Sequence, residues 1–352
     1  MAFLIANNTI PFTDLDQLRE LAVVYPYVDD LLAFVNDWFD ESQGFIQVIT
    51  SGSTGKPSLI SLSKSAMLSS AKKTEAYFGY KPGDLALCAL PLKYIAGKMM
   101  VVRAMTTNLD LVVTKASSHI FTQNPSDVSL AFVPMTPHQF LVSYNSNPTC
   151  FDVVTKILLG GGPITNQVIT IADRISSSVY LGFGMTETIT HIAVRQLGIA
   201  RPKEYEALDG VSFAVDNEDR LIISADHLGD KIFTNDVVKL ISSQKFVWLS
   251  RYDNVIISGG VKLYPEIIED KLASVLSKPF FLHPQDDPTY GQRPVLYIES
   301  DIPISNYLME QVEKRLDKFE IPSLVIPISK FLRTETGKIK RKQTVASHFA
   351  NK

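Results

Sequence analysis

The sequence predicts an α/β protein in which a large N-terminal lobe, residues 1–250, precedes a small α+β domain, residues 251–352. Three observations support this fold class. Short apolar runs typical of buried strands alternate with helical or turn-rich segments in the large lobe. Near residue 250 the pattern changes to shorter strands and helices around a Gly-Gly turn. The length of 352 residues also suits two domains of ordinary size.

The elements expected in the large lobe follow from the spacing of apolar residues. Residues 28–39 carry apolar side chains at helical spacing and predict an amphipathic helix. Residues 45–50 predict a buried strand, and residues 59–62 predict a second strand. A helix is expected over residues 64–78, because Ser63 is a favourable N-cap residue. Further apolar runs predict a buried sheet and cover residues 130–133, 153–159 and 179–181.

The small domain is expected to begin near residues 251–253, after a strand at 245–249. A tight turn is predicted at Gly259 and Gly260, and Pro265 is predicted to open a helix. A strand at 295–299, a helix at 304–317 and a strand at 324–328 complete the predicted unit.

Composition excludes several classes of protein. Hydrophobic residues make up 45% and charged residues 20%, which argues against a disordered or fibrous chain. The net charge of -3 gives no electrostatic reason to expect nucleic-acid binding. Cys88 and Cys150 are too few for a disulfide framework or a cysteine zinc site, and they fit a reducing cytoplasm. The histidines show no metal-ligand spacing.

The sequence predicts neither export nor a membrane span. The first positive charge is Arg19, so the basic flank of a secretory signal is missing at the N-terminus. The longest stretch without Asp, Glu, Lys or Arg covers residues 128–151, but three prolines interrupt it. We therefore expect a cytoplasmic protein.

Residues 50–57 form a loop rich in glycine and hydroxyl side chains between two predicted strands. Glycines let the backbone approach an anion closely, and hydroxyl and amide groups then supply hydrogen-bond donors. The loop differs from the P-loop of kinases and GTPases, because its glycines are three apart and Pro57 and a strand follow. A flexible, solvated turn is the alternative. The residues expected to bind phosphate are Thr50, Ser51, Gly52, Ser53, Thr54, Gly55 and Lys56.

Separate segments farther along the chain also carry polar or glycine-rich motifs, and two of them end predicted strands. Ligands of α/β proteins usually bind at strand ends. The segments are Gly160-Gly161-Gly162-Pro163, Phe183-Gly184-Met185-Thr186-Glu187, Thr234-Asn235-Asp236, residues 251–260 and residues 332–341.

In this order the segments resemble the acyl-adenylate-forming superfamily, which includes acyl-CoA synthetases, luciferases and the adenylation domains of peptide synthetases. The phosphate loop departs from the family pattern only at Ser58, where the family has lysine. Phe183 replaces a tyrosine of one family motif, and Asn235 replaces a glycine of another. The hinge segment at 251–260 and the C-terminal motif at 334–341 are complete.

Only 49 residues precede the phosphate loop, many fewer than in typical relatives, so we expect a shortened N-terminal subdomain. Together with residues 90–98 and 184–195, this feature is similar to the compact bacterial o-succinylbenzoate-CoA ligases of menaquinone synthesis. The resemblance implies layered sheets in the large lobe and a mobile C-terminal domain. It also implies an acid-thiol ligase that uses ATP, Mg²⁺ and CoA.

The resemblance assigns the chemical step to three residues. Lys338 corresponds to the adenylation lysine, which bridges the substrate carboxylate and the α-phosphate of ATP. Glu187, with the Thr186 hydroxyl beside it, would bind or organise Mg²⁺ at the phosphates. The alternatives are a solvated basic cluster for Lys338 and a helix-start carboxylate for Glu187.

Further residues are implied in nucleotide binding. Asp236 can accept hydrogen bonds from both ribose hydroxyls, and Arg251 can donate to the same sugar. A plain surface ion pair is the alternative for these two residues. A core position is the alternative for Phe183. The residues placed around the adenine are Gly160, Gly161, Phe183 and Gly184.

For the second half-reaction, relatives rotate the small domain about a residue at the position of Asp253. Gly259 and Gly260 would then face the active site and let the pantetheine of CoA pass. An ordinary hairpin turn is compatible with that role.

The acyl pocket is less well defined by the sequence. A second carboxylate on the substrate calls for a cation, for which Arg195 is the first candidate and Lys98 and Arg103 follow. Each of them is otherwise an ordinary surface residue. His191 is a candidate pocket residue, with structural hydrogen bonding as the alternative.

Three other functions remain open at this point. The first two are another aryl- or acyl-CoA synthetase and an adenylation enzyme that loads a carrier protein. The third is a catalytically silent nucleotide-binding module, which Ser58, Asn235 and the short N-terminus suggest and Lys338 opposes. We expect small-molecule partners, no nucleic acid, and a homodimer as a possible assembly.

Overall fold

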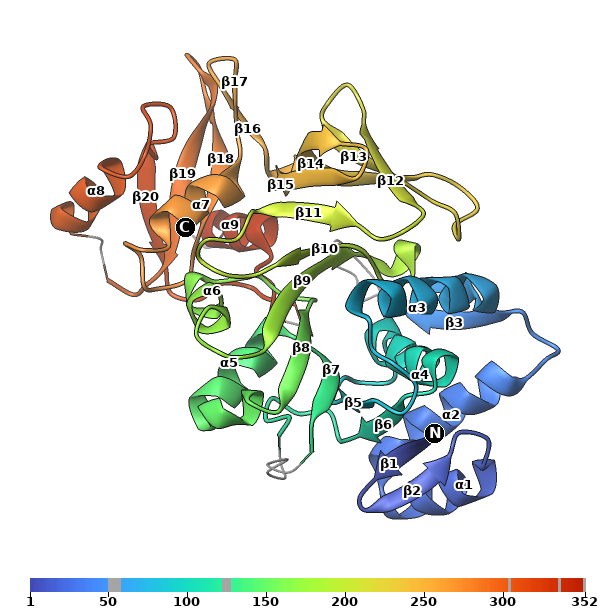
Figure 1. Ribbon diagram of the computed structural model, residues 1–352. Coiled ribbons are helices and arrows are strands. Elements are labelled where there is room, and N and C mark those ends of the chain that lie inside the picture. Colours follow the sequence, from blue (N-terminus) through green and yellow to red (C-terminus); the bar gives the residue numbers. More distant parts are fainter. Residues whose placement is uncertain (50–57, 122–127, 303–304, 335–336, 351–352) are drawn as a thin grey trace. The chain divides into compact units, whose positions relative to one another are not determined.

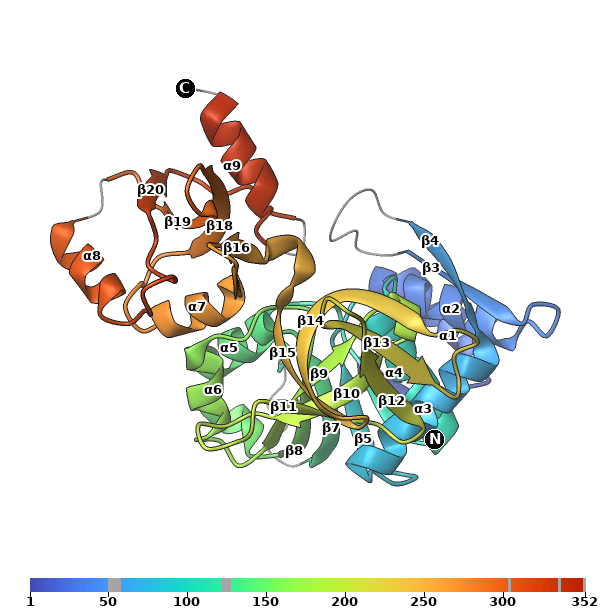
Figure 2. The same ribbon diagram turned by 90° about the horizontal axis from the view of Figure 1, so that it is seen from above.

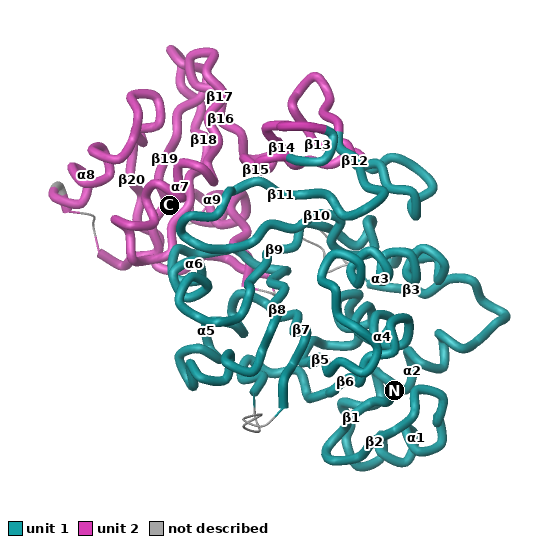
Figure 3. The backbone as a smooth tube through the Cα atoms, in the orientation of Figure 1, with its two compact units in different colours: residues 1–213, 223–232, 243–245 teal, residues 214–222, 233–242, 246–352 magenta. Residues whose placement is uncertain are grey.

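A computed structural model describes residues 1–49, 58–121, 128–302, 305–334 and 337–350 (Figure 1). The chain divides into two compact units (Figure 3). Unit 1 consists of residues 1–213, 223–232 and 243–245, and unit 2 consists of residues 214–222, 233–242 and 246–352. The chain therefore passes between the units several times before residue 246.

Unit 1 contains the buried sheet that the sequence predicts, and most of its neighbouring strands are parallel. Its strand order is β11-β10-β9-β8-β7-β5-β6-β1-β2. The neighbours from β9 to β1 run parallel, whereas β2 and β10 pair antiparallel with β1 and β9. The strands are β1 (Ala2–Ile5), β2 (Asn8–Pro11), β5 (Leu85–Cys88), β6 (Asp110–Val113), β7 (Leu130–Met135), β8 (Val154–Leu159), β9 (Ser178–Gly184), β10 (His191–Gln196) and β11 (Glu204–Ala207).

Helices cover both faces of the parallel strands. Figure 2 shows α5 and α6 on one side and α3 and α4 on the other. This arrangement follows from right-handed crossovers, because β7, β8 and β9 proceed in one direction along the sheet and β5 and β6 proceed in the other. The helices of unit 1 are α1 (Leu15–Val24), α2 (Asp29–Phe39), α3 (Lys64–Phe78), α4 (Ile95–Thr107), α5 (Pro137–Ser146) and α6 (Asn166–Ala172), and two short 3₁₀ helices are η1 (Pro26–Val28) and η2 (Pro148–Phe151).

The predicted helix at 64–78 is confirmed as α3, together with its cap. Ser63 Oγ accepts a hydrogen bond of 3.4 Å from the backbone N–H of Ala66. Gly79 ends the helix with a φ of 67°, a left-handed conformation that glycine adopts without strain.

The strand expected at 45–50 exists as β3 (Phe45–Ile49), but the prediction that it is buried is wrong. It pairs antiparallel with β4 (Leu59–Ser63) in a separate two-stranded sheet. Ile46 and Val48 are buried, whereas Phe45 and Ile49 are more than half exposed. Only one face of this ribbon is covered, because its side chains alternate between the two faces.

Unit 2 contains a second sheet with the strand order β17-β16-β19-β18, and β20 pairs parallel with β19. One apolar cluster lies between this sheet and the helices α7 and α8, and another includes side chains next to α9. The predicted helix at 304–317 is shorter in the structure. The elements are β16 (Ile256–Ser258), β17 (Val261–Leu263), α7 (Pro265–Leu272), β18 (Phe280–Asp287), β19 (Gly291–Glu299), α8 (Asn306–Glu313), β20 (Leu324–Ile328) and α9 (Arg341–Ala350).

The chain passes between the units through four further strands, β12 to β15. Of these, only β15 was predicted from the sequence. They are neighbours in the order β12-β13-β14-β15. Their bounds are β12 (Val211–Val215), β13 (Arg220–Ala225), β14 (Ile232–Ser242) and β15 (Lys245–Arg251). In the described parts of the chain, no helix has the length and apolar character needed to cross a membrane.

Candidate active site

The predicted phosphate loop, residues 50–57, lies outside the described residues. Its flanks are described and show that it joins two strands. Ile49, the last residue of β3, is opposite Leu59, the first residue of β4. This confirms the distinction from the P-loop, which would lead from a strand into a helix.

The parallel sheet of unit 1 has a point where the chain changes direction along the sheet. It lies between β5 and β7, which are neighbours although their following strands lie on opposite sides. Gln139 bridges this point, because its side-chain amide donates to the carbonyls of Ala89 (3.0 Å) and Ser117 (2.8 Å). Crevices at the carboxyl ends of such strands are the usual ligand sites of α/β sheets.

Gly160 and Gly161 follow the carboxyl end of β8. The backbone N–H of Gly160 donates to the carbonyl of Met135 (3.1 Å), which holds the glycine segment beside the end of β7. A side chain at either position would meet no atom within 4 Å, but Gly161 has a φ of 77°. The segment therefore leaves open space at the strand ends, and glycine is needed at 161 for its backbone conformation.

Phe183 and Gly184 are at the carboxyl end of β9. The Phe183 ring is partly exposed and lies 5.5 Å from the Tyr205 ring. A Cβ atom at Gly184 would lie 2.2 Å from the Thr190 carbonyl oxygen. Glycine at 184 is therefore required by the close approach of the following segment, independently of any nucleotide.

Glu187 is exposed on the 3₁₀ helix η3 (Thr186–Thr188). The segment is held by Thr188, which is buried and whose hydroxyl contacts the backbone of Met185 (2.9 Å) and the carbonyl of Thr190 (2.7 Å). Ile189 has a φ of 69°, a conformation that is strained for a β-branched residue. Packing therefore imposes this turn and presents Glu187 to solvent, an arrangement typical of functional loops.

Glu187 fits the expected role at Mg²⁺ in its chemistry. It is a hard oxygen donor and forms no ion pair with any residue that the structure describes. Within the described ranges, no group of three or more His, Cys, Asp or Glu side chains is arranged to hold a metal. A metal at Glu187 would therefore draw most of its ligands from phosphate oxygens and water, as Mg²⁺ commonly does.

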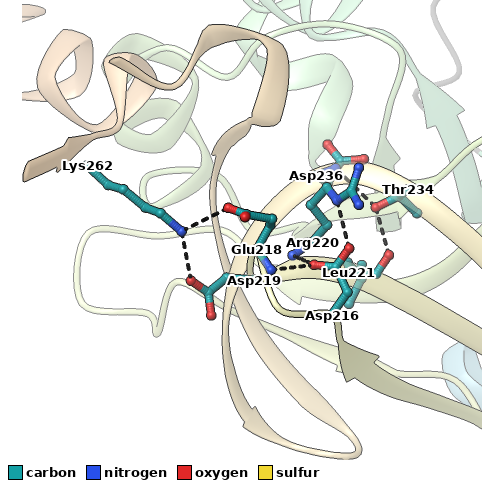
Figure 4. A network of polar contacts seen from close by, with 8 residues as sticks. All are labelled: Asp216, Glu218, Asp219, Arg220, Leu221, Thr234, Asp236 and Lys262. Atoms are coloured by element: carbon teal, nitrogen blue, oxygen red, sulfur yellow. Dashed lines mark hydrogen bonds and ion pairs between the residues drawn. The ribbon is translucent and has the colours of Figure 1, made fainter. Parts of the chain in front are cut away.

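Asp236 is 6% exposed on β14, and both of its carboxylate oxygens have a partner in unit 2. Trp248 Nε1 donates to Oδ1 (2.9 Å), and Arg251 Nη1 lies 3.5 Å from Oδ2. Burial raises the pKa of Asp236, while the Trp248 hydrogen bond and the Arg251 charge lower it. The Asp236 backbone N–H donates to Thr234 Oγ1 (3.0 Å), which donates to the Leu221 carbonyl (Figure 4).

The predicted hinge residue Asp253 is on the 3₁₀ helix η4 (Tyr252–Asn254), and its carboxylate lies 3.8 Å from Arg251 Nη2. The sequence did not indicate the contacts around this helix. The guanidinium of Arg220 lies 5.1 Å from the ring centre of Tyr252. Lys262 pairs with Glu218 (3.3 Å) and Asp219 (3.7 Å), as Figure 4 shows.

Gly259 and Gly260 form the predicted turn, between β16 and β17. Their φ values are 57° and 83°, the pattern of a two-residue turn with both central residues left-handed. The structure thus contains an ordinary hairpin turn, which is compatible with the predicted role in admitting pantetheine.

Lys338 lies beside a short antiparallel pairing near the end of unit 2. Arg333 and Ile339 form an isolated antiparallel bridge, and the Thr334 N–H donates to the Lys338 carbonyl (2.8 Å). Arg333 is anchored by a two-pronged ion pair with Glu299 (2.7 and 2.6 Å). The Lys338 side chain is exposed and forms no ion pair with the described part of the chain. The Arg333–Ile339 pairing is therefore anchored by Glu299, and the Lys338 ammonium group beside it is exposed.

The candidate acyl-pocket cations differ in their surroundings. Arg195 places its guanidinium 5.4 Å from the Tyr205 ring centre. Lys98 Nζ lies 4.7 Å from the Phe34 ring centre, and burial lowers its pKa against the opposing charges of Asp37 and Asp30.

Arg103 is only 2% exposed on α4, and it forms no ion pair within the described residues. Nη2 donates to Thr190 Oγ1 (3.0 Å), and Nη1 lies 3.6 Å from Met100 Sδ. Nε has no hydrogen-bond partner among the residues that the structure describes. A buried guanidinium without a carboxylate is costly. Arg103 therefore differs from Arg195 and Lys98, which lie over aromatic rings and are less buried.

His191 is buried beside Arg103. Thr190 Oγ1 lies 3.2 Å from Nδ1, and Thr74 Oγ1 lies 3.4 Å from Nε2. Burial, and then the charge of Arg103, lower the pKa of His191 well below its usual value. The imidazole is therefore neutral and makes the structural contacts that were the alternative reading of the sequence.

A cavity of about 440 Å³ in unit 1 lies at the other ends of the strands. Its lining includes Leu85, Ser129 and Thr155, which are at or next to the amino ends of β5, β7 and β8. It contains none of the predicted site residues.

Comparisons with known proteins agree with the motifs. The sequence profile of the AMP-binding enzyme family matches residues 21–229. An acyl-CoA synthetase (AMP-forming)/AMP-acid ligase II-like protein from Dyadobacter fermentans is 31% identical, with a TM-score of 0.62 over 92% of this chain and 95% of that one. A 2-succinylbenzoate–CoA ligase from Haemophilus influenzae is 28% identical over 342 residues, 90% of this chain and 75% of the relative.

The fold is also shared with a solved structure of lower sequence identity. O-succinylbenzoate coenzyme A synthetase (MenE) from Bacillus subtilis, in complex with ATP and a magnesium ion, is 17% identical. Its TM-score is 0.80, and the match covers 98% of this chain and 96% of that one. The family profile covers more than half of the sequence, and the chain therefore belongs to the AMP-binding enzyme family.

Proposed function

We propose that the protein is an AMP-forming acid-thiol ligase that converts 2-succinylbenzoate to its CoA thioester through an acyl adenylate. Its co-substrates are ATP and CoA, and Mg²⁺ accompanies the phosphates. The name of the Haemophilus influenzae relative and the ATP and magnesium in the Bacillus subtilis structure support this activity. The observation that carries the proposal is the exposed Lys338, which forms no ion pair with the described residues and lies beside the anchored Arg333.

In the first step the substrate carboxylate attacks the α-phosphate of ATP, and pyrophosphate leaves. Two anions must approach each other, so a cation is required between them. Lys338 supplies three N–H donors to the carboxylate and α-phosphate oxygens. The neighbouring Arg333 and Arg341 are engaged by Glu299 and Glu269. Lys338 and Lys340 are both exposed without an ion pair among the described residues, and the family motif assigns this task to Lys338.

The nucleotide contacts are assigned residue by residue. Thr50 to Lys56 hold the phosphates, and Glu187 with Thr186 provides oxygen ligands for Mg²⁺, which neutralises phosphate charge when bound. Asp236 accepts hydrogen bonds from the ribose, and Arg251 donates to it. The adenine lies against Gly160, Gly161, Phe183 and Gly184.

In the second step the thiol of CoA attacks the acyl carbon and displaces AMP. Lys338 must withdraw, so we propose that the domain from residue 251 onward rotates about Asp253 and brings Gly259 and Gly260 to the reaction centre. The absence of side chains at this turn leaves room for the pantetheine arm, and a Cβ at Gly260 would meet no atom within 4 Å.

Of the three candidate cations, Arg103 is best suited to the second carboxylate of 2-succinylbenzoate. It is the one that is almost fully buried and lacks an anionic partner among the described residues. Its Nε, like that of Arg195, has no hydrogen-bond partner there and keeps donor capacity for a carboxylate. Arg195 and Lys98 lie over aromatic rings and serve there as packing cations.

ATP–pyrophosphate exchange with a panel of carboxylic acids tests the proposal. Exchange that depends on 2-succinylbenzoate, followed by thioester formation with CoA, is the expected result. Exchange with a different acid, or transfer to a carrier protein, would replace the substrate while keeping the chemistry. ATP binding without exchange for any acid would favour a silent nucleotide-binding module. A cytoplasmic location and a homodimer remain predictions, and the latter is checked by sedimentation of the purified protein.

A further inference from the structure

The Asp236 carboxylate is held mainly by a residue outside every sequence motif described above. Trp248 on β15 donates from Nε1 to Oδ1 at 2.9 Å, whereas the Arg251 contact with Oδ2 is longer, at 3.5 Å. Arg251 is also partly exposed and shared with Asp253. The indole is therefore the closer and more directional of the two partners.

With Trp248 and Arg251 bound, the Asp236 carboxylate can still accept further hydrogen bonds. Each carboxylate oxygen has two lone pairs, so Oδ1 and Oδ2 can each accept one further hydrogen bond. The backbone of Asp236 is fixed separately by Thr234, which bonds its N–H. Rotation of the carboxylate about its side-chain bonds is consequently limited by Trp248 and, less tightly, by Arg251.

The indole also favours the charged form of the carboxylate. Asp236 is almost completely buried, and burial is the largest influence that raises its pKa. The Trp248 hydrogen bond is the largest influence that lowers it. A carboxylate that is to accept from two hydroxyl groups must be ionised, because the protonated acid loses acceptor capacity.

We infer that Trp248 is a positioning residue for ribose recognition, whose indole N–H orients the Asp236 carboxylate toward the 2′- and 3′-hydroxyls of a ribonucleoside triphosphate. This inference rests on the proposed function for the position of ATP. It adds a residue whose effect is on the choice of the sugar, in addition to any effect on rate.

Trp248→Phe removes the N–H donor and retains an aromatic ring. We expect the KM for ATP in pyrophosphate exchange to rise about tenfold, the size typical of losing a hydrogen bond to a charged group. The preference in kcat/KM for ATP over 2′-deoxy-ATP and 3′-deoxy-ATP should fall by a similar factor. The matched control is Trp38→Phe, which changes the other tryptophan, on α2 of unit 1, and should leave both values within twofold of the parent. A purely structural role of Trp248 would lower the rate for all three nucleotides together and would overturn the inference.

A binding measurement covers the cases in which Trp248→Phe does not fold or the parent shows no exchange. The sequence contains two tryptophans, so Trp248 is the only one in the Trp38→Phe protein. ATP should change its fluorescence, with an apparent Kd about tenfold lower than that for 2′-deoxy-ATP, without any need for turnover. Equal Kd values for ATP and 2′-deoxy-ATP, or no fluorescence change at ATP concentrations that saturate binding by equilibrium dialysis, would overturn the inference. Failure of exchange together with the expected fluorescence response would reject only the proposed reaction.

Discussion

Arg103 Nη2 donates a 3.0 Å hydrogen bond to Thr190 Oγ1, and this contact ties α4 to the segment just before β10. The guanidinium is buried, yet it has no carboxylate partner in the part of unit 1 that the structure describes. Proteins rarely bury a charge without compensation, because desolvation costs several kcal/mol. An anionic ligand would supply that compensation.

Arg103→Met should selectively impair the reaction with a substrate that has two carboxylates. We expect kcat/KM for 2-succinylbenzoate to fall about 100-fold, since a charged hydrogen-bonding partner is lost. The loss should be smaller for whichever monocarboxylic analogue, 4-oxo-4-phenylbutanoate or 2-butyrylbenzoate, the parent protein still activates. The melting temperature should stay the same or rise, because the variant removes an unpaired buried charge. Arg195→Met serves as the control. An equal loss for both acids, or a fall in melting temperature of more than about 4 °C, would instead indicate a structural role.

Lys338→Ala should suppress adenylation far more than it affects ATP binding. Removing a donor aimed at developing charge commonly costs about 10²–10³ in rate. ATP–pyrophosphate exchange measures the first step, and thioester formation from chemically supplied acyl adenylate measures the second. Lys340→Ala is the matched control, because Lys340 is also exposed on the same segment. Similar exchange rates in the Lys338 variant and the parent would contradict the assignment.

A bulky residue at Gly260 should damage thioester formation more than exchange. Gly260→Leu places a branched side chain on the hairpin and forces it into a φ of 83°, at a cost of roughly 1–2 kcal/mol. Gly260→Asn separates these effects, because asparagine tolerates the left-handed conformation. We expect the Asn variant to retain parental stability and exchange but to form thioester more slowly. Equal losses in the two half-reactions would argue against a turn that admits pantetheine.

The ion pair between Lys73 and Asp226 should contribute to the stability of unit 1. Lys73 is buried on α3 and donates to Asp226 and to the Asp209 carbonyl (2.6 Å). Gly210 permits this contact, since a Cβ there would lie 2.2 Å from Asp226 Oδ2. Lys73→Met should lower the free energy of unfolding by about 1–3 kcal/mol. Urea denaturation measures this, and Lys72→Met, at an exposed position, should be nearly neutral.

The same ion pair should make stability depend on pH. The Lys73 hydrogen bond is the largest influence that lowers the pKa of Asp226 in the folded protein. A carboxylate with a depressed folded-state pKa contributes stability above its unfolded pKa and loses it as the pH falls through the folded value. The difference between parent and Lys73→Met should therefore be constant near neutrality and shrink below about pH 4. A difference that persists unchanged at pH 2 would attribute the effect to packing of the lysine stem.

Local signals in the sequence predicted much of the fold. Ser63 was predicted as the cap of α3 because a cap is encoded by a single residue, and the apolar runs of β7, β8 and β9 match buried parallel strands. The alternation of β3 between buried and exposed residues was missed, because an apolar run alone does not tell how many faces are covered. The strands β12 to β14 were also missed, although β12 (VSFAV) and β13 (RLIISA) are mainly apolar.

The site was predicted where it depends on motifs and missed where it depends on long-range pairing. Asp236 was identified, but its partner Trp248 is brought beside it only by the adjacency of β14 and β15. The isolation of Arg103 was not visible either, because burial depends on elements distant in sequence. Sequence patterns name candidate groups, and the tertiary environment decides which of them are unpaired.

The division of the chain into interleaved segments has a practical consequence for protein engineering. Unit 2 is assembled from three stretches, and two of them, residues 214–222 and 233–242, are encoded upstream of residues 243–245 of unit 1. A gene fragment that starts at codon 246 would omit both. Chimeras that exchange this unit between relatives will need several crossovers, and a single protease cut will not release it intact.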